Sequence, residues 1–291
     1  MILVAGATGQ LGGLIAERLL EKGEKVRILV RPGSDYEHLV TAGAEPVIGD
    51  LKDPSSLATA CRGVDSVVTT ANSTARGGND TVQSVDRVGN VNLIDAAAAA
   101  GVGHFIFVSL FGAQANHPIP LMAAKGETED HLRASGMEWT VLQPNLFFDK
   151  LPMMVMAPAF TGQPVTLVGE GRRIHSLVAM RDVVEYAVAA LEQEQSRGKT
   201  LVIGGPAPVS WRDVVAAFVA AFDRKIPIRT VPINEPIPGM PDFVYGLLAA
   251  LEGYDSPLDS SNLADSYGVT PTTLAEFVHQ TAANHHQQHD D

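Results

Sequence analysis

The stretch MILVAGATGQLGG, Met1 to Gly13, decides the fold that this sequence predicts. Its residues Ile2 to Ala5 form a short apolar run, typical of a strand buried on both faces of a parallel sheet. Three glycines follow with the spacing GxxGxxG, namely Gly6, Gly9 and Gly12. Apolar residues then recur at helical spacing from Leu11 to Leu20. A strand, a glycine-rich loop and a helix, in this order, make up a dinucleotide-binding site.

Each glycine has a physical reason to stand where it does. Gly6 permits a tight exit from the strand, Gly9 lets the backbone approach a pyrophosphate, and Gly12 lets the helix pack closely on the strand. The unpaired amides at the helix start then point at the phosphates, and the helix dipole favours their negative charge. The alternative is an ordinary glycine-rich turn, and the strand-to-helix context weighs against it.

Length, composition and charge bound the remaining possibilities. The 291 residues suit either two modest domains or one large α/β unit, and no apolar run approaches the ~20 residues of a membrane helix. The formal charge of −12 repels nucleic acid. Cys61 is the single cysteine, so no internal disulfide forms. We therefore expect a cytoplasmic monomer or homodimer that is not exported and that binds neither nucleic acid nor membrane.

The second predicted strand, Lys25 to Val30, ends at Arg31. In a doubly wound sheet this position faces the adenosine ribose, where an acidic residue selects NAD and an arginine accommodates the 2′-phosphate of NADP. The guanidinium of Arg31 has the geometry for a phosphate, and Ser34 adds a hydroxyl. The sequence thus favours NADP(H) over NAD(H). The alternative is a surface arginine at a strand end.

Four more strands alternate with helices up to Pro144, which predicts a doubly wound parallel sheet of the Rossmann type over residues 1–144. Asp50 and Leu51, after the third strand, are expected to flank the adenine. The polar loop Ala71 to Asp80, after the fourth, is expected to line the nicotinamide side. From Thr81 we expect one long helix.

Residues 145–283 predict a smaller α+β lobe that binds substrate, parts of which return to the Rossmann sheet. The segment Phe147 to Phe160 is rich in Phe and Met, which suits an adaptable apolar pocket or, equally, a core helix. Two strands, Val165–Val168 and Ile174–Ala179, are expected with a turn between them. We expect the tail, 284–291, to be disordered despite its three histidines and two aspartates, and we expect no metal site.

Several motifs together resemble the NmrA-like atypical short-chain dehydrogenases/reductases over almost the full length. They are the GATGQLG opening, Arg31, Gly49-Asp50-Leu51, the fifth-strand end Ser109 to Ala113, Lys125, the sixth-strand segment Ser135 to Pro144, and the later Asp182-Val183. The resemblance implies an NADP(H)-binding Rossmann domain with a small lobe that closes over the nicotinamide. It also implies a small apolar substrate, because the reductases of this family act on quinones, dyes, enones or imines.

One position departs from the wider family. Typical short-chain dehydrogenases carry TyrxxxLys, whereas here Leu121 stands four residues before Lys125. The resemblance therefore implies either an NADPH-dependent reductase of a quinone, carbonyl or enone, or an inactive NADP(H)-binding regulator or assembly factor. Sugar-nucleotide epimerisation normally keeps the tyrosine, so its absence counts against that activity. The alternative reading of Lys125 is a solvated helix residue.

The candidate residues divide into two groups. We expect Lys125 to orient the cofactor or act as a general acid, and Ser109 to donate a proton to the product oxygen. The predicted cofactor-binding residues are Gly6, Thr8, Gly9, Gln10, Leu11, Gly12, Arg31, Asp50, Leu51, Ala71, Asn72, Ser73, Lys125 and Asn145.

Overall fold

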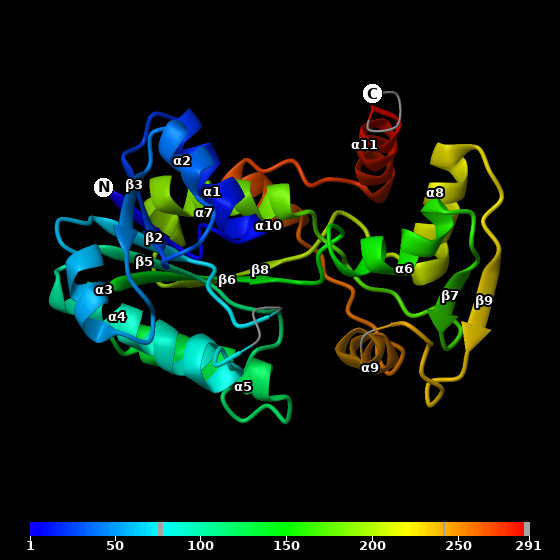
Figure 1. Cartoon of the computed structure of the whole chain (residues 1–291), viewed down its shortest axis with the longest axis horizontal. Coiled ribbons are helices and arrows are strands. Elements are labelled where there is room, and N and C mark those ends of the chain that lie inside the picture. The colour runs from blue at the N-terminus through cyan, green and yellow to red at the C-terminus, as the bar shows by residue number, and fades with distance from the viewer. Residues whose placement is uncertain (75–77, 241, 288–291) are drawn as a thin grey trace. The chain divides into compact units, whose positions relative to one another are not determined.

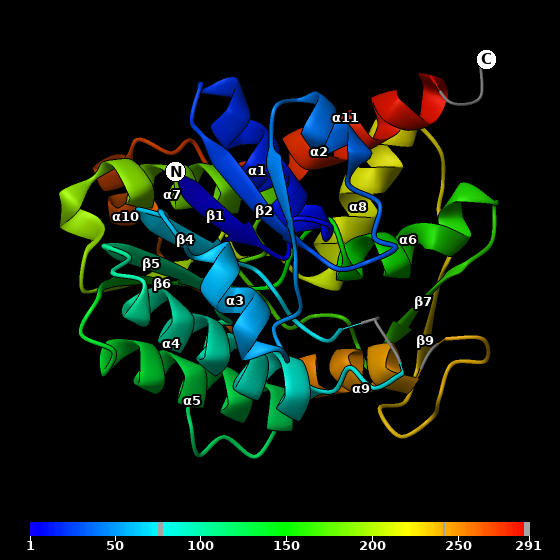
Figure 2. The same ribbon diagram turned by 60° about the vertical axis from the view of Figure 1, so that its left-hand side comes forward.

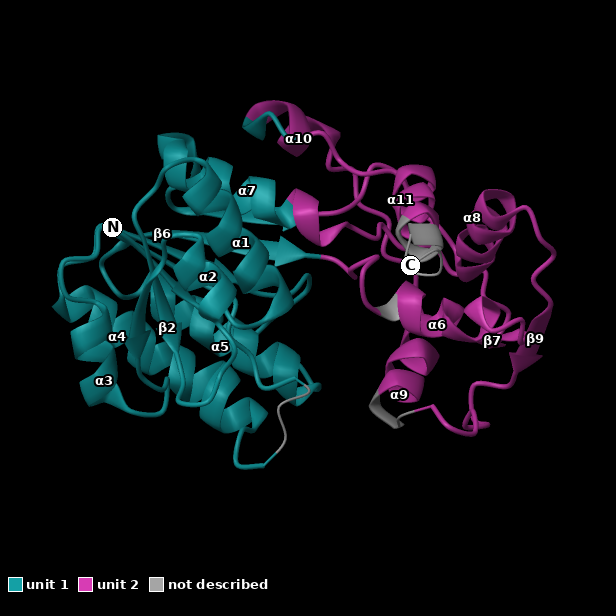
Figure 3. Ribbon diagram, turned by 45° about the horizontal axis from the view of Figure 1, so that its top comes forward, with its two compact units in different colours: residues 1–144, 183–202, 267–269 teal, residues 145–182, 203–266, 270–291 magenta. Residues whose placement is uncertain are grey.

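A computed structural model describes residues 1–74, 78–240 and 242–287 and divides the chain into two compact units. The first unit contains 1–144, 183–202 and 267–269, and the second contains 145–182, 203–266 and 270–291 (Figure 3). The predicted loop residues 75–77 and tail residues 288–291 lie outside the described part. Residues 284–287, which we expected to be disordered, belong to the last helix instead.

The first unit is built on a seven-stranded sheet in the order β3-β2-β1-β4-β5-β6-β8. Its strands are β1 (Ile2–Ala5), β2 (Val26–Val30), β3 (Glu45–Ile48), β4 (Ser66–Thr69), β5 (His104–Val108), β6 (Glu138–Pro144) and β8 (Lys199–Ile203). The pairs from β3 to β6 are all parallel. This order confirms the predicted doubly wound Rossmann sheet, in which ligands bind at the carboxyl ends of the strands.

Helices cover both faces of this sheet (Figures 1 and 2). One face carries α1 (Gln10–Glu21) and α7 (Met180–Glu192), which are joined by an ion pair between Arg18 and Glu185 at 2.8 Å. The other carries α3 (Pro54–Ala60), α4 (Asn90–Ala99) and α5 (Pro120–Arg133). The unit also contains the short helix α2 (Glu37–Thr41) and the 3-10 turn Glu194–Ser196. Because both faces are covered, all of β1 and β5 is buried, as the continuous apolar runs predict.

The single helix expected from Thr81 is instead a π-helix, η1 (Val82–Gly89), followed by α4. Thr81 and Ser84 form a capping box at its start. The amide Nδ2 of Asn90 donates to the carbonyls of Val85 and Asp86, at 3.1 and 3.2 Å. A buried side chain therefore stabilises the change of helical register. Hydrophobic periodicity cannot distinguish such a register change from a regular helix.

The second unit packs helices around a two-stranded parallel sheet, β7 (Val165–Val168) with β9 (Ile228–Val231). Its helices are α6 (Leu151–Phe160), α8 (Trp211–Phe222), α9 (Asp242–Leu251), α10 (Ser261–Tyr267) and α11 (Leu274–Gln287). The strand expected at Ile174–Ala179 is wrong, because His175 and Val178 make only isolated bridges there. Phe148 and Met156 are buried in the core of this unit, whereas Met154 is exposed.

Among the residues that the structure describes, no helix combines the length and the apolar character needed to cross a membrane.

His104 on β5 makes folding stability depend on pH. Its Nε2 lies 2.9 Å from Thr140 Oγ1, and burial, assisted by the charge of Arg197, lowers the pKa of the ring to about 4. As the pH falls, the unfolded chain takes up a proton on this ring before the folded chain does. The full free energy of unfolding is therefore present above pH ~6.5, and about 3 kcal/mol of it is lost as the pH falls toward 4. Urea unfolding at pH 7 and at pH 5 should show that wild type loses more free energy of unfolding between these two pH values than His104→Gln does. Equal losses would contradict this.

Candidate functional site

A hollow that is open to solvent lies at the carboxyl ends of β1 to β4, and its empty space, open solvent included, is about 410 Å³. Most of its lining residues come from the connections that follow these four strands, and Leu29 and Val85 come from β2 and η1 themselves. The lining residues are Gly6, Thr8, Leu29, Arg31, Gly49, Asp50, Leu51, Ala71, Asp80 and Val85. The structure thus gathers six of the predicted cofactor-binding residues around one hollow, at the sheet edge where Rossmann folds place a ligand.

The glycine loop is shaped by close backbone contacts. Gly6 has a φ of +88°, and a Cβ there would lie 2.7 Å from Thr70 Oγ1 and 2.9 Å from the amide of Ala71. A Cβ on Gly12 would lie 2.2 Å from the carbonyl oxygen of Gly6. Both positions therefore require glycine for the loop to pack against β4 and α1.

Helix α1 begins directly behind this loop. Gly9 is its N-cap residue and has no side chain to accept a bond from the first-turn amides. Those amides, which start at Gln10 and Leu11, therefore remain available to an anion, and the helix dipole adds a favourable field. Thr8, Gly9 and Gln10 are exposed. This cradle has the donors and the open backbone that a dinucleotide diphosphate needs.

Arg31 does not stand alone at the end of β2. Its Nη1 lies 2.6 Å from Asp80 Oδ2, and Lys52 Nζ lies 2.5 Å from Asp80 Oδ1. Lys52 also faces Asp50 at 3.8 Å. The hydrogen bond from Lys52, with help from the charge of Arg31, lowers the pKa of Asp80 despite partial burial. The hollow therefore contains a carboxylate held between two cations.

The loop after β4 is anchored to η1. Ser73 donates to Asp86 Oδ2 from its backbone amide at 3.0 Å and from its hydroxyl at 2.6 Å. Asn72 instead closes a local turn, since its Nδ2 donates to Thr70 O and its Oδ1 accepts from the amide of Thr74. The two predicted residues thus have different local roles. Ser73 fixes the loop to a buried carboxylate.

Lys125 on α5 is buried rather than solvated, since only 3% of the residue is exposed. Its Nζ donates to Val108 O at 3.3 Å, lies 4.8 Å from the ring centre of Phe107, and faces Asp86 Oδ1 at 3.8 Å. Burial lowers the pKa of the ammonium, and the nearby carboxylates of Asp86 and Glu129 oppose that shift. A buried ammonium with a depressed pKa is suited to proton donation.

Ser109 at the end of β5 is occupied by a different partner. Its hydroxyl donates to the buried carboxylate of Glu129, which also accepts from Gln143 Nε2 at 2.9 Å and from Arg133 Nη2 at 2.8 Å. Ser109 is 2% exposed and is not among the residues that line the hollow. Its predicted role as a proton donor to substrate stays a prediction, and this contact gives it a structural partner.

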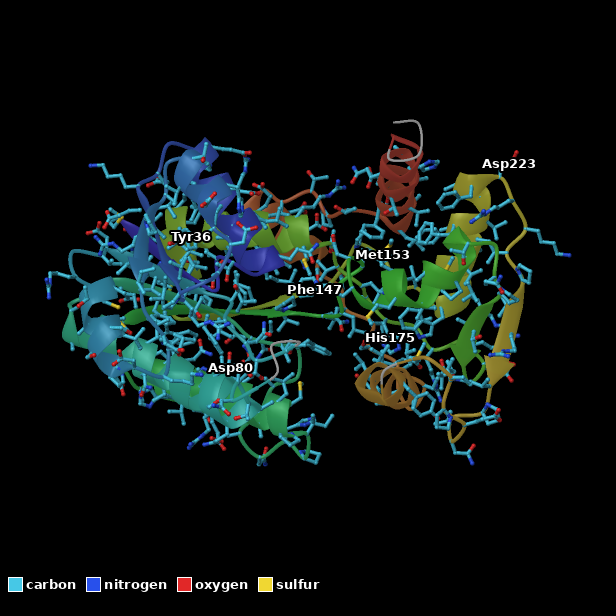
Figure 4. The ribbon with its side chains drawn as sticks, viewed as in Figure 1. Tyr36, Asp80, Phe147, Met153, His175 and Asp223 are labelled. Atoms are coloured by element: carbon cyan, nitrogen blue, oxygen red, sulfur yellow. The ribbon has the colours of Figure 1, made fainter. Side chains whose placement is uncertain are left out.

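Asn145 belongs to the second unit, where its Nδ2 donates to the carbonyl oxygen and the hydroxyl of Ser256, both at 3.2 Å. Ser256 Oγ in turn lies 2.7 Å from His175 Nδ1. Figure 4 labels His175, Phe147 and Met153 within this unit. The part of Asn145 in cofactor binding stays a prediction, as does that of the segment 147–160 in substrate binding.

Three comparisons bear on this site. The sequence model of a family described as NAD(P)H-binding matches residues 6–194. The NAD(P)H azoreductase of Xenophilus azovorans is 33% identical over 234 residues, which cover 80% of this chain and 77% of that protein. The photosystem II assembly factor Ycf39 of Trieres chinensis is 32% identical over 205 residues, which cover 70% of this chain and 63% of that protein.

Among solved structures, the NADPH-dependent quinone oxidoreductase of Escherichia coli, complexed with NADPH, superposes with a TM-score of 0.80. The two chains are 24% identical, and the match covers 97% of this chain and 99% of the other. At this identity the likeness concerns the fold. The matched fold therefore extends beyond the Rossmann sheet to nearly the whole chain.

Proposed function

Because the chain belongs to the NAD(P)H-binding family, we propose that it is an NADPH-dependent oxidoreductase that transfers hydride to a small apolar quinone, carbonyl or enone. The observation that carries the proposal is the hollow at the carboxyl ends of β1 to β4, with the glycine cradle on one side and Arg31 on the other. The similarity to an azoreductase and the fold shared with a quinone oxidoreductase support the choice of acceptor class.

A bound reduced nicotinamide supplies the hydride and so carries the redox chemistry. The residues of this chain bind and orient it. The amides at the start of α1 hold the diphosphate, and Arg31 pairs with the adenosine 2′-phosphate. Lys125, whose ammonium is buried beside Asp86, serves as the proton donor or as a ribose hydrogen-bond donor. Proximity of donor and acceptor supplies most of the acceleration, since a quinone needs little acid assistance.

A second function, an NADP(H)-binding regulator or assembly factor without turnover, is favoured by a specific observation. Leu121 stands one turn before Lys125 on α5 in place of a catalytic phenol, and Lys125 is buried. The similarity to an assembly factor supports the same reading. In that case the cofactor site would report nucleotide occupancy to a partner protein.

Mixing the purified chain with NADPH and a panel of benzoquinone, menadione, an azo dye and a cyclic enone distinguishes the two functions. Loss of the reduced-nicotinamide absorbance band with at least one acceptor supports the reductase. Tight NADPH binding by calorimetry without turnover on any acceptor supports the regulator. Absence of binding heat from both NADPH and NADH contradicts both functions.

Arg31→Glu tests the choice of cofactor. The variant loses charge-assisted hydrogen bonds to the 2′-phosphate, each worth about 1.5–3 kcal/mol, so the Kd for NADPH should rise about 10- to 100-fold. NADH lacks this phosphate, and its Kd should change far less. The two dissociation constants, measured by fluorescence titration, check the result. If Arg31→Glu weakens the binding of NADPH and NADH by the same factor, Arg31 does not bind the 2′-phosphate.

A further inference from the structure

We propose that the Asp80 carboxylate competes with the 2′-phosphate of NADPH for Arg31 and Lys52, and that this competition sets how strongly the site prefers NADPH to NADH. The proposal rests on the cofactor site of the proposed function. It adds Asp80 as a specificity-determining residue and Lys52 as a second cation for the phosphate.

The geometry places one carboxylate on both cations. Asp80, labelled in Figure 4, lies in the loop between β4 and η1. Its two oxygens are divided, with Oδ2 at 2.6 Å from Arg31 Nη1 and Oδ1 at 2.5 Å from Lys52 Nζ. Only 6% of the Asp80 side chain is exposed, against 39% of Arg31 and 34% of Lys52. The carboxylate therefore occupies Arg31 Nη1 and Lys52 Nζ, two donor atoms that a phosphate would use.

The local charges make this contact a competition. Arg31 and Lys52 supply two positive charges, and Asp80 and Asp50 supply two negative ones within the same ion-pair cluster. A 2′-phosphate brings further negative charge to cations that already face carboxylates, so it must displace Asp80 to gain the full attraction of Arg31 and Lys52. The 2′-hydroxyl of NADH needs no such displacement. Asp80 therefore reduces the preference for NADPH that Arg31 alone would give.

The chain lets the carboxylate leave without unfolding its neighbours. Asp80 directly precedes Thr81, whose hydroxyl and amide form the capping box with Ser84. Ser84 Oγ also donates to the carbonyl of Asn79 at 3.2 Å. The backbone on both sides of Asp80 is therefore held by contacts that do not involve its side chain, and rotation of that side chain breaks its ion pairs with Arg31 and Lys52.

The test is Asp80→Asn, which keeps the size of the side chain and removes its charge. We would titrate wild type and variant with NADPH, NADH, 2′,5′-ADP and 5′-ADP by calorimetry. We expect the variant to bind NADPH and 2′,5′-ADP at least about tenfold more tightly than wild type does. Its affinities for NADH and 5′-ADP should change by less than about threefold. The adenosine bisphosphate reports the phosphate contact without any turnover.

Two further variants sharpen the result. Lys52→Gln, introduced into the Asp80→Asn chain, should weaken 2′,5′-ADP about tenfold, because the phosphate then loses its second cation. Asp95→Asn is the control, since it makes the same change in net charge at a carboxylate on α4 that is 62% exposed and paired with His131. Asp95→Asn should leave all four affinities unchanged.

If the NADPH affinity of Asp80→Asn equals that of wild type, this inference is overturned and the proposed function is not affected. Weakened NADH binding in that variant also overturns it, because Asp80 would then be a ligand of the ribose hydroxyls. Failure of wild type and variant alike to bind any of the four probes overturns the proposed function together with the inference. A thermal melt of each variant confirms that the comparison is between folded proteins.

Discussion

Replacing Gly12 by alanine is expected to weaken NADPH binding severely and to destabilise the first unit. The new Cβ would lie 2.2 Å from the carbonyl oxygen of Gly6 and 2.6 Å from Thr70 Oγ1. Since the first obstacle is backbone, α1 must move away from the loop, which carries its first-turn amides off the diphosphate. Overpacking of this kind costs about 1–3 kcal/mol, and loss of the amide contacts should raise the Kd at least about 100-fold.

Calorimetric titration with NADPH and urea unfolding measure the two effects of Gly12→Ala. The matched control is Gly246→Ala on α9, where an added Cβ meets no atom within 4 Å and the backbone φ is not positive. That change should leave binding intact and hold or raise stability, because alanine favours a helix by about 1 kcal/mol over glycine. If Gly12→Ala binds NADPH as tightly as wild type does, the close packing of α1 on the glycine loop is not needed to bind the diphosphate.

Lys125→Met should cost both activity and stability. The substitution preserves the aliphatic stem but leaves the fully buried carboxylate of Asp86 without its counterion at 3.8 Å. Breaking a buried ion pair from one side costs about 3–5 kcal/mol. If Lys125 donates the proton, turnover of a carbonyl or enone should fall about 10²- to 10⁴-fold, and turnover of a quinone should fall less. Urea unfolding and kcat on the best acceptor measure the two losses.

Lys22→Met provides the matched control for Lys125→Met. Lys22 forms a surface ion pair with Glu192 at 2.8 Å, and such pairs contribute at most about 1 kcal/mol. Combining Lys125→Met with Asp86→Asn should recover part of the lost stability, because the unpaired charge is removed. Stability unchanged by Lys125→Met would show that the ammonium and the carboxylate do not stabilise one another.

Asp86→Asn alone gives a pH signature. Burial lowers the pKa of Lys125, and the Asp86 carboxylate opposes this shift. Removing that charge lowers the pKa further, so activity that needs the ammonium should begin to fall at a lower pH than in wild type. The measurement is the pH–activity profile of both enzymes. If activity falls at the same alkaline pH in both, Lys125 is not the titrating group.

The glycine loop and the alternation of strands with helices could be predicted because both depend on local pattern. The run Ile2–Ala5 and the spacing of Gly6, Gly9 and Gly12 follow from steric needs within one strand-loop-helix unit, and the structure confirms that unit. Arg31 lines the hollow because it directly follows β2, and its contact with the 2′-phosphate stays a prediction.

Partners distant in sequence could not be predicted. Asp80 is 49 residues from Arg31, and no periodicity joins the two. Ser109 was chosen for its place at a strand end, yet the direction of its hydroxyl is decided by Glu129, 20 residues later. Glu129 and Asp86 are acidic residues on helices, and acidic side chains are usually exposed to solvent. Only the folded structure shows that both are buried.

The discontinuous make-up of the first unit has a consequence for biosynthesis. Strand β8 and most of α7 leave the ribosome after residues 145–182, which belong to the other unit. Until then β6 is an unprotected edge with free backbone donors, open to pairing with another nascent chain. The glycine loop is thus synthesised well before β8, and it exists while the sheet that carries it still lacks that strand.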